Sequence, residues 1–360
     1  MLTRMSWPPR IDGVGTSTAG LVGNATAGPV DQAVLVTSLV DYEQVFGGLQ
    51  SGHDLWLGVR LFFENGGHRA WAVRVGGQGQ AAIRRALSAL DVVDELGLLC
   101  LPGLSSPGAL AAAAAYARSR RAFYVAEAAA SRPATLNAVG AIAAADQGHV
   151  AVYLPRLVIT DPLHPPATMS FGPSAAVTGM LARLDIERGV WTFPTGFASG
   201  ARVQGIVGLG SAIDVQAAAL LRRSGVNALR ALPGRGFRPW GARTVGSGRD
   251  RGEDWKYVSI RRLALFLEES IDRGLGWAAF EPNDEPTWRT IREAVEAFLD
   301  WTFRMGGLAG ESPAEAFFVR CGSDTTTQRD IERGIVGIEV GFAPLRPAEF
   351  VTFRLRHTWA

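Results

Sequence analysis

Lysine is almost missing from this chain. Of 36 basic residues only Lys256 is a lysine, and 34 acidic residues nearly balance the basic ones. The formal net charge of +2 is too small, and the charge too evenly spread, to favour a nucleic-acid-binding protein. Arginine in place of lysine favours planar, bidentate pairing with carboxylates, which suits fixed interfaces.

Cysteine and long apolar runs are also scarce. The two cysteines, Cys100 and Cys321, exclude a disulfide framework and a cysteine-rich metal site. No window offers the roughly 18 uninterrupted apolar residues that a membrane span needs. The first residues lack the apolar core of a secretory peptide, so we expect the chain to fold in the cytoplasm.

Apolar residues are plentiful, at 47% of 360 residues against 19% charged, which excludes a disordered, collagen-like or coiled-coil protein. The chain is longer than a domain with a single hydrophobic core usually is, so we expect two or three domains. Up to about residue 200, short apolar runs alternate with helical patterns, which predicts a doubly wound α/β core with a largely parallel sheet. The predicted strands are 19–23, 34–36, 70–75, 96–101, 122–125 and 150–154.

The predicted helices of this core have identifiable ends. Asp54 is expected to cap a helix that stops at Gly66-Gly67, and Ser105 or Ser106 to cap an alanine-rich helix with Pro107 in its first turn. Residues 132–145 and 174–184 also have a helical pattern.

Glycine, proline and arginine crowd into residues 232–254, where the apolar periodicity lapses, so we place the main domain boundary there. Beyond it, a helix ending at Gly274, a helix begun by Asp284 or Glu285, and two alternating strands predict an α+β domain. The predicted organisation is a short N-terminal arm (1–18), the α/β core (19–240), a linker (241–254) and the C-terminal domain (255–360).

Catalytic patterns are weak. The histidines are scattered without metal-ligand spacing, and His53, His68 and His149 are expected at turns or strand starts rather than beside a nucleophile. The turn from Gly208 to Ser211 lacks the motif of a nucleophile elbow, and Gly13 to Thr18 precedes a strand, unlike a nucleotide-binding loop. We therefore predict no catalytic, metal or cofactor site.

An acidic cluster lies among arginines between residues 261 and 292. Its members are Glu268, Glu269, Asp272, Glu281, Asp284 and Glu285, opposite Arg261, Arg262, Arg273, Arg289 and Arg292. We interpret it as helix-surface and inter-subunit ion pairs, in preference to acid–base catalysis.

Several blocks of the chain resemble contractile tail sheath proteins. The specific ones are WAAFEPNDE (277–285) and FAPLRPAEFV (342–351). Further blocks are IDGVGTST (11–18), WGARTV (240–245), WKYVSIRR (255–262), FLEESID (266–272), AFFVR (316–320) and TTQRD (326–330). The chain is most similar to the short sheath proteins of phage-tail-like injection systems, R-type tailocins and contractile phage tails.

The resemblance implies a subtilisin-like but non-catalytic core and a mechanical role. Subunits of the family stack as hexameric rings around an inner tube, link through added strands, and contract to drive the tube through a target envelope. Expected partners are further copies of the chain, the inner tube protein, and baseplate and cap proteins, without nucleic acid, membrane insertion or cofactor. Assembly is expected in the bacterial cytoplasm, within a phage tail or a particle that can be released.

The family commonly opens with a longer arm, whereas here ten residues precede Ile11 and Pro8-Pro9 lacks backbone donors. Either the start is late, or this is a specialised paralogue with a weaker N-terminal link. Two readings compete with a sheath subunit: a baseplate or tail-terminator protein with a sheath-like fold, and a subtilisin-like hydrolase.

Two groups of residues are predicted to mediate assembly. The C-terminal strand alternates apolar and arginine side chains and is expected to pair with a neighbouring subunit. Its residues are Phe350, Val351, Thr352, Phe353, Arg354, Leu355 and Arg356. Polar, reversible contacts to the tube are expected from Arg289, Arg292, Glu293, Glu296, Asp330 and Arg333.

Overall fold

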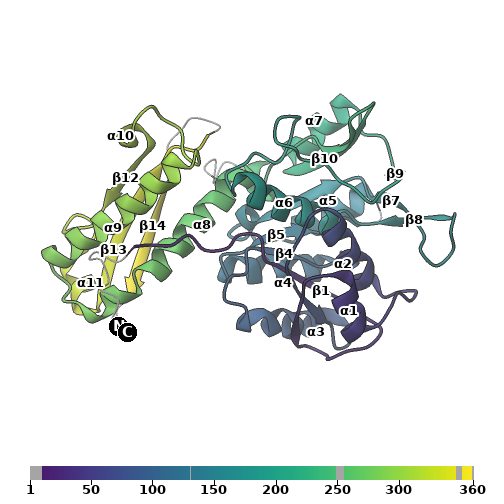
Figure 1. Ribbon diagram of the computed structural model, residues 1–360, viewed down its shortest axis with the longest axis horizontal. Coiled ribbons are helices and arrows are strands. Elements are labelled where there is room, and N and C mark those ends of the chain that lie inside the picture. The colour runs from purple at the N-terminus through teal and green to yellow at the C-terminus, as the bar shows by residue number, and fades with distance from the viewer. Residues whose placement is uncertain (1–9, 130, 249–254, 346–350, 359–360) are drawn as a thin grey trace. The chain divides into compact units, whose positions relative to one another are not determined.

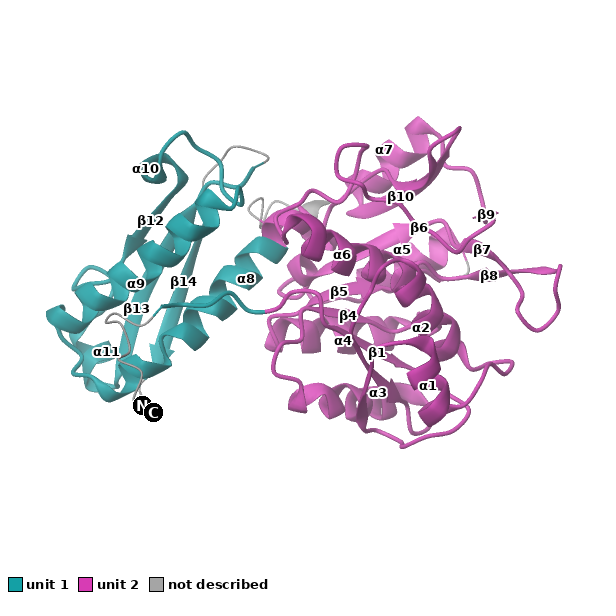
Figure 2. Cartoon of the chain, viewed as in Figure 1, with its two compact units in different colours: residues 1–14, 262–360 teal, residues 15–261 magenta. Residues whose placement is uncertain are grey.

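The computed structural model describes residues 10–129, 131–248, 255–345 and 351–358 (Figure 1). The chain forms two compact units (Figure 2). The larger comprises residues 15–261, and the smaller combines residues 10–14 with the described residues from 262 onward.

The larger unit is built on an eight-stranded sheet within the described residues. Its order is β11-β10-β6-β5-β4-β1-β3-β2. The strands are β1 (Ala19–Gly23), β2 (Ala33–Val36), β3 (Ala70–Arg74), β4 (Leu98–Cys100), β5 (Phe123–Ala126), β6 (Val150–Leu154), β10 (Val226–Leu232) and β11 (Gly236–Pro239). The inner pairs are parallel, whereas β2 and β11 join the edges in antiparallel fashion.

The order of the sheet confirms the predicted doubly wound core. From β1 the chain reaches β3 on one side and then returns to β4 on the other, which is the reversal that defines a doubly wound sheet. Strands β1, β4, β5 and β6 are buried along their whole length, because helices cover both faces of a parallel sheet.

Seven helices accompany this sheet in the described residues: α1 (Leu39–Phe46), α2 (Asp54–Glu64), α3 (Gly79–Ser88), α4 (Pro107–Ser119), α5 (Arg132–Gly140), α6 (Ser174–Arg188) and α7 (Val215–Arg223). Ser106 caps α4 as predicted, accepting a hydrogen bond from the Ala109 N–H at 3.3 Å. The predicted cap of α2 is wrong: Asp54 is already helical, and the capping position belongs to His53, whose side chain makes no cap bond.

A small second sheet in the larger unit was not predicted. Strands β7 (Leu157–Thr160) and β8 (Thr168–Phe171) form a hairpin, and β9 (Gly208–Leu209) pairs with the other edge of β7. The hairpin extends beyond the main sheet at the right of Figure 1.

The smaller unit is α+β. It contains most of α8 (Val258–Gly274), then α9 (Glu285–Arg304) and the short helices α10 (Pro313–Ala316) and α11 (Gln328–Glu332). Its antiparallel sheet has the order β12 (Phe317–Arg320), β13 (Ile335–Phe342), β14 (Val351–Thr358). Helix α9 is amphipathic, and its apolar face is buried through Trp288, Ile291, Val295, Phe298 and Leu299.

The segment from residue 10 to residue 14 belongs to the smaller unit, as its colour in Figure 2 shows. Ile11 is 3% exposed, and the Val14 N–H donates to Ser270 Oγ at 3.1 Å. Residues 1–9 of the predicted arm, including Pro8-Pro9, lie outside the described residues, as do residues 249–254 of the predicted linker. Residues 241–248 are part of the larger unit.

Candidate functional site

Strand β14 holds the residues predicted to link subunits, except Phe350, which lies outside the described residues. The strand pairs with β13 along its whole length, from Val351 opposite Phe342 to Thr358 opposite Ile335. The predicted alternation is confirmed: the apolar side chains of 351, 353 and 355 are buried, whereas 352, 354 and 356 are exposed. The strand therefore has one dry and one wet face.

The outer edge of β14 is open in the described part of the chain. β14 ends the sheet order, so only its inner edge is paired, by β13. An edge strand presents unpaired N–H and C=O groups that can bind another extended chain. This sheet can thus extend by a strand without giving up its own pairs.

The wet face of β14 is tied to the rest of the smaller unit by charged pairs. Arg354 pairs with Glu339 at 3.1 Å, and Arg356 pairs with Asp330. On the opposite face, near the end of the strand, His357 Nδ1 lies 3.2 Å from the Asp272 carboxylate. Sequence reasoning missed these partners. The period-two pattern of residues 335–342 was the available signal, because the pairing of β13 with β14 places Glu339 directly opposite Arg354.

The predicted tube-facing residues differ in their exposure and in the contacts they make within the smaller unit. Arg289, Glu293 and Glu296 are exposed on α9. Arg292 is half-buried, donates to the Cys321 carbonyl, and pairs with Glu285 at 3.0 Å. The guanidinium of Arg292 therefore holds the loop after β12, and its contact to the tube stays a prediction.

Asp330 is also occupied within the smaller unit. It closes a capping box with Thr327 at the start of α11, and these hydrogen bonds, with the Thr327 hydroxyl as the largest cause, lower the pKa of Asp330. Arg333 follows α11 as an exposed capping residue. No hydrogen bond or ion pair joins Asp330 or Arg333 to Arg289, Glu293 or Glu296 among the described residues.

The interpretation of the acidic cluster as ion pairs is supported at two positions. Arg273 pairs with Glu269 one turn away at 2.6 Å, and Arg292 pairs with Glu285. Arg261 instead contacts His149 and lies over the Trp255 ring, at 4.4 Å from its centre.

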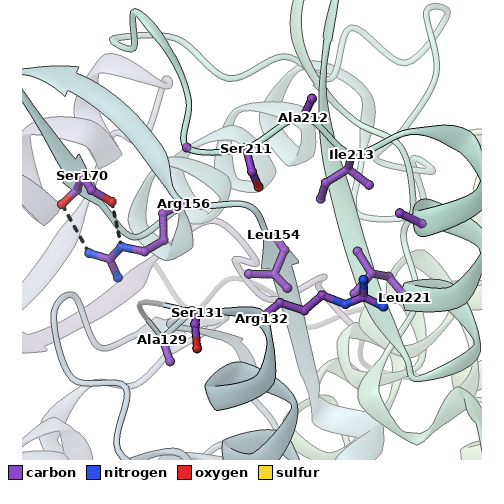
Figure 3. Close-up of a pocket in the computed structure, with 12 residues that line it drawn as sticks. Ala129, Ser131, Arg132, Leu154, Arg156, Ser170, Ser211, Ala212, Ile213 and Leu221 are labelled. Carbon is purple, nitrogen blue, oxygen red and sulfur yellow. Dashed lines mark hydrogen bonds between the residues drawn. The ribbon is translucent and has the colours of Figure 1, made fainter.

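A cavity of about 360 Å³ opens at the carboxyl ends of β5 and β6, where α/β enzymes commonly bind ligands (Figure 3). Ser131, Ser170 and Ser211 line it, together with Arg132 and Arg156. Figure 3 shows the Arg156 guanidinium turned to Ser170, and Ser131 Oγ is engaged by the Ala134 N–H. Neither a histidine nor a carboxylate is among the lining residues, so these serines lack a base there.

The candidate histidines lie elsewhere. His53 precedes α2, and His68 Nδ1 contacts the Gly66 carbonyl at 2.7 Å in an exposed turn. His149 is buried just before β6, with Nδ1 3.3 Å from the Ala122 carbonyl and Nε2 accepting from Arg261 Nη2 at 2.8 Å. Burial, aided by the positive charge of Arg261, lowers the pKa of His149 to about 3, so this ring is neutral and structural.

Sequence reasoning missed the buried carboxyl of Glu127, which follows β5. Burial raises its pKa to about 7, although Ser174 Oγ donates to it at 2.6 Å. A single acidic residue in the apolar run 122–130 was the signal available. Both cysteines are buried free thiols, and burial raises the pKa of Cys321 to about 12.

Among the described residues, no group of three histidine, cysteine or carboxylate side chains could hold a metal ion. No described helix is both long and apolar enough to cross a bilayer.

Comparisons with known proteins point to one family. The model of the phage tail sheath C-terminal domain matches residues 250–358. The tail sheath protein of Vibrio phage KVP40 is 25% identical over 178 residues, which are 49% of this chain and 25% of that protein. This chain thus matches only a quarter of the length of that curated relative.

Solved structures match over nearly the whole chain. The sheath of the anti-feeding prophage in its contracted state is 28% identical, with 96% of this chain and 94% of that one covered and a TM-score of 0.77. The contracted sheath of the extracellular contractile injection system PVC is 26% identical, with 96% and 93% covered and a TM-score of 0.77. A sheath tail protein of Listeria innocua, 11% identical, shares the fold over 97% of each chain with a TM-score of 0.72. The chain thus carries a phage tail sheath C-terminal domain at residues 250–358, and over nearly its whole length it is similar in sequence and fold to contractile tail sheath proteins.

Proposed function

We propose that this chain is the structural subunit of a contractile sheath, which polymerises as stacked hexameric rings around an inner tube and contracts to drive the tube through a target envelope. The observation that carries the proposal is the likeness, over 96% of the chain, to two sheaths solved in their contracted state. The particle is a phage tail or a phage-tail-like assembly, put together in the bacterial cytoplasm.

Strand β14 supplies the link between neighbouring subunits in this proposal. Its inner edge belongs to its own sheet and its outer edge is open, so a strand from the next subunit can add there without unfolding anything. Residues 10–14, the described part of the predicted arm that lies in this unit, pack in the same unit as β14, so an N-terminal link would act on the same body.

Contacts to the inner tube come from the exposed α9 residues Arg289, Glu293 and Glu296, with Arg333 as a further candidate. Solvated charges suit a contact that must break on contraction, because released charges are hydrated again at little cost. Arg292 and Asp330 contribute indirectly, by holding the smaller unit together.

The larger unit acts as a non-catalytic scaffold of the subtilisin-like type. Its doubly wound parallel sheet supports this assignment, and so does a carboxyl-edge cavity lined by serines without a base. We propose the domain limits 19–240 and 255–360 for the core and the C-terminal domain, with a linker at 241–254 and an arm at 1–18. Residues 15–18 of this arm and 241–248 of this linker pack with the larger unit.

A baseplate role is the second candidate, favoured by matches to anti-feeding prophage baseplate structures at 26–27% identity with TM-scores of 0.75 and 0.78. Negative-stain microscopy of the purified protein separates the two. Long striated or cogwheel tubes support the sheath, a discrete ring supports the baseplate or tail-terminator role, and small particles that turn over substrate would contradict both.

A further inference from the structure

Positive charge collects without counter-charge in one part of the larger unit. Residues 191–248 contain seven arginines and a single acidic residue, Asp214. Three of these arginines lie on the β10–β11 hairpin: Arg230, Arg235 and Arg238. No carboxylate lies within ion-pair distance of any of the three in the described part of the chain.

The β10–β11 hairpin places two positive charges directly opposite each other. Arg230 and Arg238 are direct cross-strand partners, so both side chains leave the same face of the hairpin. Like charges placed opposite each other destabilise an isolated pair of strands. A cross-strand pair of arginines without an internal counter-ion is typical of a surface that binds a partner outside the chain.

Exposed aromatic rings lie under these arginines. The Arg235 guanidinium is 4.2 Å and that of Arg238 5.4 Å from the centre of the Phe197 ring, and Arg230 lies 4.8 Å from that of Trp240. Phe197 is 48% exposed and Trp240 39%. We call these five residues the arginine–aromatic patch. Arginine and aromatic side chains together are the composition of protein–protein hot spots.

The smaller unit carries a surface of complementary chemistry. Phe280, the last residue of a short 3-10 helix (Gly276–Phe280), is 90% exposed. Glu281 follows it directly and Asp284 and Glu285 lie within the next four residues; we call Phe280 and these three acidic residues the Phe280 corner. Asp284 accepts the Thr287 N–H and Glu285 pairs with Arg292, whereas the Glu281 carboxylate has no hydrogen-bond or ion-pair partner among the described residues.

We propose that the arginine–aromatic patch of one copy of this chain binds the Phe280 corner of another copy. Phe280 packs against the rings of Phe197 and Trp240, and Glu281 pairs with Arg235, the most solvent-exposed arginine of the patch. The inference rests on the proposed function, since a sheath subunit is surrounded by copies of itself. It adds a side-chain contact to the strand-mediated link.

The apolar ring and the negative charge of the Phe280 corner together indicate which surface it binds. An apolar ring that is almost fully exposed is costly to leave in water, and flanking carboxylates require a basic counterpart. The patch offers both aromatic and basic groups. An acidic surface on the tube protein is the competing occupant, but binding there would leave Phe280 without a partner.

A charge exchange between two variants tests the contact. The first is Arg230→Glu with Arg235→Glu, which makes the patch acidic; the second is Glu281→Arg, which makes the corner basic. Alone, each variant sets like charges against each other, so we expect the pelletable assembly to fall at least about tenfold. Mixed, each altered surface finds an opposite charge on the other variant, so assembly should return as an alternating copolymer.

Control variants keep the result interpretable. Arg222→Glu with Arg223→Glu changes two exposed arginines of α7 outside the patch and should assemble like the wild type. Phe280→Ser alters a side chain that is almost fully exposed, so the melting temperature should stay unchanged while assembly weakens. If a charge variant fails to fold, Phe280→Ser still tests the contact.

Unchanged assembly of the patch and Phe280 variants would overturn the inference, and so would a mixture that stays unassembled although both variants fold. If the patch variants assemble less than the wild type only when the tube protein is present, the patch binds the tube instead of another copy of the chain. If the wild-type protein forms no tubes, the proposed sheath function is contradicted. The contact between copies can then still be tested by measuring the association of the two charge variants by sedimentation velocity.

Discussion

Ile11 lies buried against Gly274, although the two residues are far apart in the sequence. A Cβ atom at position 274 would come within 2.7 Å of Ile11 Cγ1. Glycine at the end of α8 is therefore what allows the N-terminal segment to lie against the helix.

Gly274→Ala is expected to destabilise the smaller unit by about 1–3 kcal/mol, because overpacking a close contact forces its neighbours to move. Urea unfolding measures the change. Gly276→Ala is the matched control, since a Cβ there meets nothing within 4 Å. Adding Ile11→Ala to Gly274→Ala should recover part of the loss; additive losses from the two changes would mean that the residues are not coupled.

Two buried titratable groups in the larger unit act in opposite directions on stability. The pKa of His149 is lowered from 6.5 to about 3, so the unfolded state binds more protons and stability is lost as pH falls through this window. The pKa of Glu127 is raised from 4.5 to about 7, so the folded state binds more protons and stability is lost as pH rises through that window.

Single variants should separate the two effects between about pH 4.5 and 6.5. Relative to the wild type, Glu127→Gln is expected to gain stability as pH rises, and His149→Gln to gain it as pH falls, each by up to about 1.4 kcal/mol per pH unit. Chemical unfolding at several pH values measures both slopes. A Glu127→Gln curve parallel to the wild-type curve would show that this carboxyl does not titrate in the folded state as stated.

Arg292 and Arg289 lie on the same helix and should behave differently. Arg292→Ala removes the donor to the Cys321 carbonyl and should cost about 1–3 kcal/mol in unfolding free energy. Arg289→Ala, at an exposed position, should change it by less than about 0.5 kcal/mol. In assembled particles, Arg289→Glu should lower the extended fraction seen by microscopy; an unchanged fraction would reject its contact with the tube.

Deleting residues 356–360 should leave a folded monomer that cannot build long tubes. The deletion removes the last pairs of β14 with β13, opposite Gly337, Val336 and Ile335, and shortens the open edge. Full-length protein with Arg356→Ala and His357→Ala is the control, because it loses the side-chain pairs but keeps the backbone edge. Tubes of normal length from the truncated chain would show that β14 is not the linker.

A serine-reactive fluorophosphonate should leave the intact protein unlabelled. The serines at the carboxyl edge of the sheet have no histidine or carboxylate beside them in their cavity, and His149 is held neutral by burial and by Arg261. Mass spectrometry of the treated protein checks this. Stoichiometric labelling of one serine that disappears when one histidine is replaced would reinstate a hydrolase.

The sequence was informative where burial alone decides structure. Strands β4, β5 and β6 are continuous apolar runs because both faces of a parallel sheet are covered, so their positions could be predicted. The β10–β11 hairpin was missed because arginine, glycine and proline interrupt its pattern. The three arginines of the hairpin belong to the arginine–aromatic patch, so the residues that hide the strand pattern are those for which we propose a surface role.

The predicted assembly residues illustrate a second limit. The alternation along β14 fixed which side chains face the core, and this was confirmed. The partners of Arg292 and Asp330 could not be predicted from α9 and its neighbours, because the Cys321 carbonyl and the capping box depend on how loops fold back. Exposure of a charged residue is a tertiary property, and helical spacing alone does not give it.

The larger unit is inserted between residue 14 and residue 262 of the smaller one. In a sheath linked through the N-terminal segment and β14, a pull between neighbouring subunits enters and leaves through the smaller unit. The hydrogen bonds of Val14 with Ser270 and of β13 with β14 then carry the tension. The doubly wound core would then lie outside the path of the tension, so its own strands would bear no pull between neighbouring subunits.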